Sequence, residues 1–200
     1  KEFDRYRRAG QPHPLMEEFK VQAVPFQHAQ IDTWRETFTG VVALHKPTNL
    51  HVFGAVDDLW VNPKGQVIVV DYKATAKDRD VSIDSDWQIS YKRQMEVYQW
   101  LLRQNDLDVS ATGYFVYTNG RMDLDSFGDR LEFRTKIIQY KGSDDWVEPT
   151  LERMKACMDS DTMPPVGDDI MGGPCSYCSY ARARTELTLA AIKKSATLKA

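Results

Sequence analysis

This 200-residue sequence has no long apolar run, little cysteine and no excess of basic charge. No run approaches the ~20 apolar residues that a membrane-spanning helix needs, which excludes such a span from the sequence. Three cysteines suit a reducing compartment, and the first residues show no signal-peptide pattern, so we expect a cytoplasmic protein. Because the net charge is −3, a nucleic-acid partner would have to be bound by a local basic patch.

The composition, 42% hydrophobic and 28% charged, is that of an ordinary globular protein with one large domain. The opening residues KEFDRYRRAG carry no initiator methionine and look like the latter half of a helix. We therefore expect sequence upstream of this start to be missing.

The most informative stretch is residues 51–75, HVFGAVDDLWVNPKGQVIVVDYKAT. Apolar positions between Val52 and Val61 predict one strand, and the run from Gln66 to Val70 predicts a second. Between them, Asn62-Pro63-Lys64-Gly65 is a turn sequence, because proline fixes φ at the first corner and glycine tolerates a positive φ. The stretch is thus predicted to be a β-hairpin.

Three acids and a lysine interrupt this apolar hairpin: Asp57, Asp58, Asp71 and Lys73. A buried carboxylate is costly unless it is paired or bound to a cation. Asp71 ends the apolar run VIVV, and Lys73, two residues later, shares its strand face. The pattern indicates a functional site.

Apolar spacing predicts further helices and strands on both sides of the hairpin. The strongest helix covers residues 86–103, with Trp87, Tyr91, Met95, Tyr98 and Leu102 on one stripe. The other predicted helices are residues 2–8, 146–158 (Met154 and Met158 inward) and 185–199, and the other strands are residues 40–45, 112–117 and 131–140. Residues 31–37 form a short amphipathic segment. This order predicts an α/β fold in which helices flank a mixed central sheet.

Three motifs in this order resemble the PD-(D/E)xK nuclease superfamily, in its RecB-type branch. That branch carries G-x-x-D on one strand, D/E-x-K on the next and Q-x-x-x-Y on the following helix. Each motif alone is weak, but three in order on the expected elements are specific. The matching stretches here are Gly54-Ala55-Val56-Asp57, Asp71-Tyr72-Lys73 and Gln94-Met95-Glu96-Val97-Tyr98.

The resemblance implies a restriction-endonuclease-like fold and sets the expected domain organisation. We expect a nuclease-like domain over residues 1–160, with its core at about residues 38–118. Residues 161–200, which contain the C-x-x-C sequence and the last helix, are expected to pack on the same domain.

The chemistry of phosphodiester hydrolysis explains the residue types. The reaction needs an activated water and a counter-charge for its transition state, which hard cations with oxygen ligands supply. Asp57 and Asp71, on adjacent strands, could share a Mg²⁺ or Mn²⁺ with the backbone carbonyl of Tyr72. Lys73 would orient the water or stabilise negative charge. By the resemblance, Gln94 and Tyr98 border the active site.

Taken singly, each of these residues has a more ordinary explanation. Asp57 and Asp58 could be solvent-facing acids on an edge strand, and Asp71 with Lys73 could form a plain ion pair. Tyr98 belongs to the apolar stripe of its helix and could be a core residue. The conjunction of motifs favours the active site. Asp58 ranks second as a candidate, because successive strand residues face opposite ways.

Histidines and cysteines depart from the branch pattern. RecB-type nucleases usually carry a metal-binding histidine before the first strand, but His13, His28 and His45 stand in no version of that motif. Cys175 and Cys178 resemble the cysteine cluster of iron–sulfur members, which needs four thiolates. Since Cys157 falls in a predicted helix as a core residue, this chain alone leaves the cluster incomplete. Three alternatives remain open: cysteines missing upstream complete the cluster, or the C-x-x-C sequence is a vestige, or it is a zinc half-site.

DNA, as single strands or duplex ends, is the partner that the resemblance implies. Lys92 and Arg93 on the central helix could bind phosphates, and Tyr91, Trp87 or Trp100 could stack on bases. Two functions fit: a metal-dependent DNA nuclease acting on ends, similar to RecB-type and CRISPR-adaptation nucleases, or a non-catalytic nucleic-acid-binding module. The second function would place the chain in a repair, recombination or phage complex, where it could have protein partners.

Overall fold

The computed structural model describes residues 2–126, 128–169 and 172–197. The chain divides into two compact units, Lys1–Ala156 and Cys157–Ala200. The first unit contains the central sheet and the helices around it, and the second contains the last helix. No helix among the described residues has the length and apolar character to cross a membrane.

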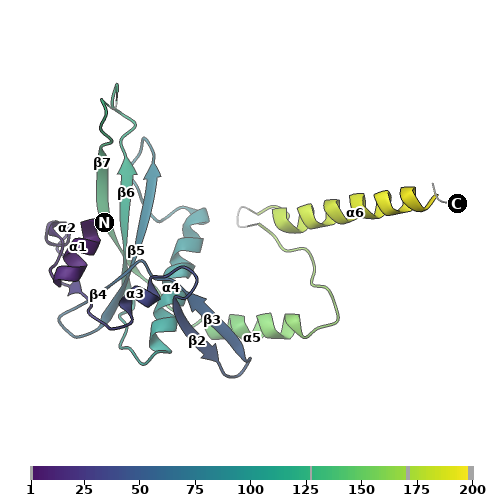
Figure 1. The fold of residues 1–200 in the computed structure, drawn as a ribbon, viewed down its shortest axis with the longest axis horizontal. Helices are drawn as coiled ribbons and strands as arrows, with labels where there is room; N and C mark the ends of the chain where they lie inside the picture. The colour runs from purple at the N-terminus through teal and green to yellow at the C-terminus, as the bar shows by residue number, and fades with distance from the viewer. Residues whose placement is uncertain (1, 127, 170–171, 198–200) are drawn as a thin grey trace. The chain divides into compact units, whose positions relative to one another are not determined.

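The central sheet of the first unit has five strands in the order β1-β4-β5-β6-β7 (Figure 1). β5 and β6 are parallel, and the other neighbouring strands are antiparallel. The predicted mixed α/β fold is therefore confirmed. The strands are β1 (Val24–Pro25), β4 (Asp58–Val61), β5 (Val67–Ala76), β6 (Thr112–Gly120) and β7 (Phe133–Lys141).

Helices cover both faces of this sheet (Figure 1). Val67 and Val69 of β5 belong to one apolar cluster with residues of α4, whereas Ile68 and Val70 belong to a second cluster that includes Met16 of α2. The alternation follows from the two-residue period of a strand. The helices are α1 (Glu2–Ala9), α2 (Pro14–Glu18), α3 (Ile31–Trp34), the 3-10 helix η1 (Asp86–Gln88), α4 (Ile89–Arg103), α5 (Val147–Met158) and α6 (Ser176–Thr197).

The predicted hairpin is only half correct. The turn forms as expected, with Gly65 at φ +83° and its N–H bonded to the Asn62 carbonyl. The segment from Val52 to Val61, however, is two strands, because the chain leaves the ladder after Gly54. The first, β3 (Leu50–Gly54), pairs with β2 (Val41–His45) in a separate two-stranded sheet, and only β4 pairs with β5.

Two helix predictions also need correction. The last helix begins at Ser176, nine residues before the predicted start, so Cys178 lies inside its first turn. In α5, Val147 and Leu151 are buried as expected, but Met154 and Met158 are exposed. The helical spacing of these methionines therefore does not mark a buried face.

Candidate active site

Strand β5 carries two of the candidate residues on the face that α4 covers. Asp71 and Lys73 follow Val67 and Val69 in the two-residue alternation, and Asp71 is only 2% exposed. The Lys73 Nζ lies 2.7 Å from Asp71 Oδ2. It also donates a 3.0 Å hydrogen bond to Gln94 Oε1 of α4. The sheet and the helix thus meet at this lysine.

Asp57 is placed by the break between β3 and β4. It directly precedes Asp58, whose antiparallel partner is Val70, so the same register puts residue 57 opposite Asp71. Its Oδ2 accepts a 2.7 Å hydrogen bond from the backbone N–H of Tyr72. The predicted proximity of the two acids is therefore present.

Gln94 and Tyr98 extend the contacts of Lys73 along α4. The Gln94 Nε2 donates a 2.8 Å hydrogen bond to the Tyr98 hydroxyl oxygen, one helical turn away. Gln94 thereby bridges Lys73 and Tyr98 through its two amide atoms. Tyr98 is also largely buried in the core cluster. It is therefore both a core residue and a neighbour of the candidate site, the two alternatives that the sequence left open.

Burial, together with the nearby charge of Asp57, raises the pKa of Asp71 to about 6. Lys73 opposes this rise by stabilising the ionised form. A carboxylate with this balance of influences is still ionised at neutral pH. It is also a strong candidate for a cation-binding role, since perturbed carboxylates cluster at functional sites.

The donor set fits a hard divalent cation. Asp71 Oδ2 is buried, and among the described residues it has no hydrogen-bond partner, because its 2.7 Å contact with Lys73 is an ion pair without hydrogen-bond geometry. The described residues offer no cluster of three or more histidine, cysteine or acidic side chains. Two carboxylates with a backbone carbonyl match Mg²⁺, which keeps several waters in its shell.

On the opposite face of the sheet, Asp58 of β4 has a different environment. Its Oδ2 accepts a 2.6 Å hydrogen bond from the Tyr72 hydroxyl, and its Oδ1 lies 3.9 Å from Arg7 Nε of α1. Burial raises the pKa of Asp58, while the Tyr72 bond and the nearby arginines lower it. Asp58 is therefore part of a buried network behind the site.

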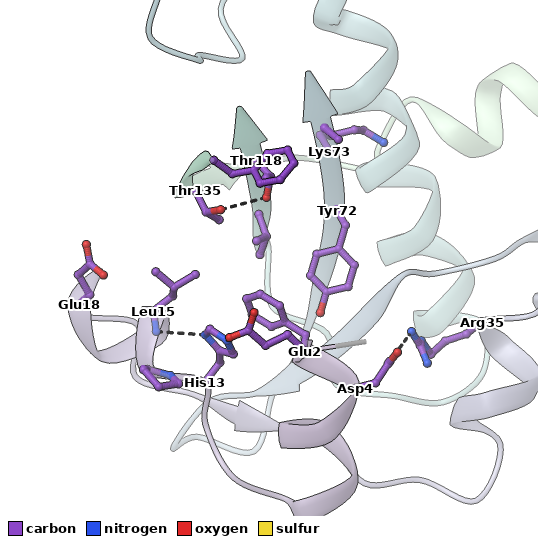
Figure 2. A pocket seen from close by; sticks show the side chains of 15 residues that line it. Glu2, Asp4, His13, Leu15, Glu18, Arg35, Tyr72, Lys73, Thr118 and Thr135 are labelled. Carbon is purple, nitrogen blue, oxygen red and sulfur yellow. Dashed lines mark hydrogen bonds and ion pairs between the residues drawn. The ribbon is translucent and has the colours of Figure 1, made fainter. Parts of the chain in front are cut away.

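A cavity of about 810 Å³ lies on this second face (Figure 2). Tyr72, His13 and Thr118 are among its lining residues, and Figure 2 shows the Tyr72 ring directed toward Glu2 and Asp4 of α1. Although Lys73 touches its edge, the Lys73 ammonium bonds to Gln94 of α4. The carboxylate cluster and this cavity are thus separate features.

Sequence reasoning missed Arg35, which follows α3. Its Nε donates a 2.6 Å hydrogen bond to the backbone carbonyl of Asp57, and its guanidinium lies 2.9 Å from Asp4 Oδ1. Arg35 therefore fixes the main chain that carries the candidate ligand. No local signal marks it, because both contacts join segments that are distant in the sequence.

The three residues expected to bind nucleic acid do not form one group. The Tyr91 ring lies 4.6 Å from Lys73 Nζ and so belongs to the site. Lys92 is instead over the Tyr140 ring of β7, and Arg93 is over Trp146 before α5. A role for Lys92 and Arg93 in binding nucleic acid remains a prediction.

Three histidines have local partners of their own. His13 caps α2 and stacks on Phe3, and His28 stacks on Trp34. His45 is hydrogen-bonded to Thr48. His13 and His45 are buried rather than exposed.

Comparison with known families agrees with this arrangement. A family model described as the PD-(D/E)XK nuclease superfamily matches residues 2–183. The chain belongs to the PD-(D/E)XK nuclease superfamily. Searches among curated proteins and solved structures find no match. Members of this superfamily are usually metal-dependent phosphodiester hydrolases, and their usual ions are Mg²⁺ and Mn²⁺.

The match of the PD-(D/E)XK family extends into the second unit and covers the C-x-x-C sequence. Here Cys175 immediately precedes α6, and hydrogen bonds from the Cys178 and Tyr177 backbone lower the pKa of its thiol. Cys157 is exposed, contrary to the expected core position. Whether Cys175 and Cys178 serve an iron–sulfur cluster stays a prediction.

Proposed function

We propose that this chain is a metal-dependent deoxyribonuclease of the RecB-type branch, which degrades or trims DNA from its ends. The observation that supports it most is the cluster of Asp57, Asp71, Lys73 and Gln94, which the start of β4, strand β5 and helix α4 bring together. A carboxylate pair beside a lysine is costly to bury, and a cation and a phosphate group would offset that cost.

Asp57, Asp71 and the Tyr72 carbonyl are the groups that would hold a Mg²⁺ or Mn²⁺. Such an ion supplies Lewis-acid activation of water and counter-charge for the phosphate. Lys73 contributes a point charge at the scissile phosphate, where negative charge grows in the transition state. Gln94 holds this ammonium through its Oε1 and limits the positions it can adopt.

The order of the three motifs along the chain supports the RecB-type assignment and, with it, action on DNA ends. The structural support for catalysis is that all four residues of this cluster are present and lie together. A module that only binds nucleic acid has no physical need to bury Asp71 beside a second carboxylate, Asp57, with Lys73 as its ion-pair partner.

The test is cleavage of linear and covalently closed circular DNA by the full chain, with Mg²⁺, Mn²⁺ or EDTA. We expect metal-dependent loss of the linear DNA while the circle persists. Asp71→Asn and Lys73→Ala should abolish this cleavage, because one removes a charged ligand and the other removes the charge beside the phosphate. Both variants should remain folded.

Matched controls come from exposed positions of the same residue types, Asp106→Asn and Lys64→Ala. Both should cleave at the wild-type rate. Wild-type activity in Asp71→Asn or Lys73→Ala would refute the proposed site. DNA binding without any cleavage by the wild-type chain would instead identify a non-catalytic nucleic-acid-binding module, and degradation of the circle would refute the requirement for ends.

A further inference from the structure

Two lysines, one near the C-terminal end of β5 and one just after it, lie over two aromatic rings of the neighbouring helical segment. Lys73 Nζ lies 4.6 Å from the Tyr91 ring centre, and Lys77 Nζ lies 4.8 Å from that of Trp87. The two rings meet edge to face, with centroids 5.5 Å apart. Since Lys73 also contacts Asp71, this series of two lysine–ring contacts begins at the candidate active site and extends away from it.

Both sides of the outer pair are held in place by buried amides. Asn119 of β6 accepts a hydrogen bond from the Lys77 N–H and donates one to its carbonyl, which fixes the chain just beyond β5. On the other side, Ser85 and Gln88 form a capping box around Trp87, and Gln88 also bonds to the Ser82 carbonyl. Trp87 is 37% exposed, and the capping box fixes the backbone that carries its ring.

A small polar cavity of about 150 Å³ adjoins this pair. Lys77 and Arg79 line it together with the hydroxyl-bearing Ser82 and Ser85. The one carboxylate in its lining, Asp80, is ion-paired with Lys136 at 2.9 Å. The residues that line the cavity thus include two with cationic and two with hydroxyl side chains, and these groups bind phosphate oxygens.

We propose that Trp87, Lys77 and Arg79 form a subsite for one unpaired nucleotide of a single-stranded DNA end. Its base stacks on Trp87, and its phosphate enters the cavity beside Lys77 and Arg79. This inference rests on the proposed nuclease function, and it adds the class of substrate. Lys73 and Lys77 are four residues apart in an extended chain, about 13 Å, so one strand can reach both.

The chemistry favours a single strand over a duplex. An aromatic side chain binds a base through the base's flat face, and in a duplex the neighbouring base pairs cover that face. A duplex offers the edges of its bases, which are recognised by hydrogen bonds rather than by an exposed ring. A platform with two adjacent cations is the arrangement that sequence-independent binding of single strands uses.

Lys77 covers the Trp87 ring when no nucleotide is bound, and this contact is easily exchanged. A cation–π contact at an exposed site is weak, and the lysine stem is flexible. The ammonium can therefore turn from the ring to a phosphate when a base takes its place. Each partner keeps an interaction in both states.

The experiment measures binding in EDTA, where no metal-dependent cleavage occurs. The probes are a fluorescein-labelled oligo(dT) about 12 nucleotides long, an oligomer of the same length without bases, and a blunt hairpin duplex. We expect Trp87→Ala to weaken oligo(dT) binding about five- to a hundredfold, and Trp87→Phe to retain most of it. The baseless oligomer and the duplex should lose little affinity. Phe38→Ala, at a fully exposed aromatic residue, is the matched control.

An unchanged oligo(dT) affinity in Trp87→Ala, an equal loss on the duplex, or no binding of oligo(dT) by the wild-type chain would overturn the subsite. Cleavage with Mn²⁺ separates this outcome from failure of the proposed function. Trp87-dependent binding without cleavage leaves the subsite intact and refutes the nuclease. Cleavage with Trp87-independent binding refutes only the subsite.

Discussion

Gly54 of β3 and Tyr98 of α4 are in such close contact that no side chain fits between them. A Cβ built on Gly54 would lie 2.6 Å from Tyr98 Cε1 and 3.1 Å from Cδ1. The glycine of the first motif and the tyrosine of the third are therefore packed against each other. The glycine is required here by close approach rather than by an unusual backbone angle.

Gly54→Ala should displace the Tyr98 ring and destabilise the fold by about 1–3 kcal/mol, the usual cost of overpacking. Cleavage should slow as well, because the shift breaks the Gln94–Tyr98 bond. Urea unfolding and initial cleavage rates measure the two effects. In Gly54→Ala/Tyr98→Leu the unfolding penalties should be less than additive. Gly167→Ala, with open space around its Cβ, is the control, and wild-type behaviour of Gly54→Ala would contradict the prediction.

Gln94→Ala should slow cleavage by about 10²-fold or more, because Lys73 loses the oxygen that holds it. Its unfolding free energy should change by only about 0.5 kcal/mol, since Gln94 is not in the core. Tyr98→Phe, which removes only the hydroxyl, should have a smaller effect on rate. Rate and melting temperature are compared on one DNA substrate, and normal cleavage by Gln94→Ala would remove the third motif from the site.

Mn²⁺ should raise the melting temperature of the wild-type chain, because an ion that binds only the folded state stabilises it by mass action. The effect should disappear in Asp57→Ala and remain in Asp106→Asn. Thermal melts with increasing Mn²⁺ test this expectation. A melting temperature that does not respond at saturating Mn²⁺ would count against a preformed site.

In EDTA, Asp71 should make the fold less stable as the pH rises. Its folded-state pKa is raised from 3.8 to about 6, so the folded protein holds this proton more tightly than the unfolded chain. The stabilisation is complete below pH 4 and is lost as the pH passes through 6, at a cost of about 3 kcal/mol. Urea unfolding between pH 4 and 8 should show a smaller decrease in unfolding free energy for Asp71→Asn than for the wild-type chain. If the two plots of unfolding free energy against pH are parallel, the raised pKa of Asp71 is refuted.

Local periodicity made most of the site predictable from the sequence. Asp71 and Lys73 share a face through the two-residue period of a strand, and Gln94 and Tyr98 do so through the helical turn. Asp57 could be paired with Asp71 because hairpin register depends on a short turn. In each case the relevant partners are close in sequence or belong to a recognised motif.

What could not be predicted depends on contacts between distant segments. Apolar residues continue across Ala55 and Val56, so nothing local indicated that β3 pairs with β2 instead of β5. Arg35 gains its role only when α3 approaches the start of β4. Nothing local marked Ser176 as the start of α6, and the helix was predicted only from residue 185.

Tyr72 connects the site to α1, since its N–H holds Asp57 and its hydroxyl holds Asp58, which lies beside Arg7. α1 is joined to the sheet by side-chain contacts and by no strand pairing, so its order depends on these contacts. Elements of this kind open locally at a lower free energy than the whole domain. The position of the Asp57 carboxylate is therefore fixed only while α1 stays attached. On warming, the geometry for catalysis should be lost while the sheet is still folded.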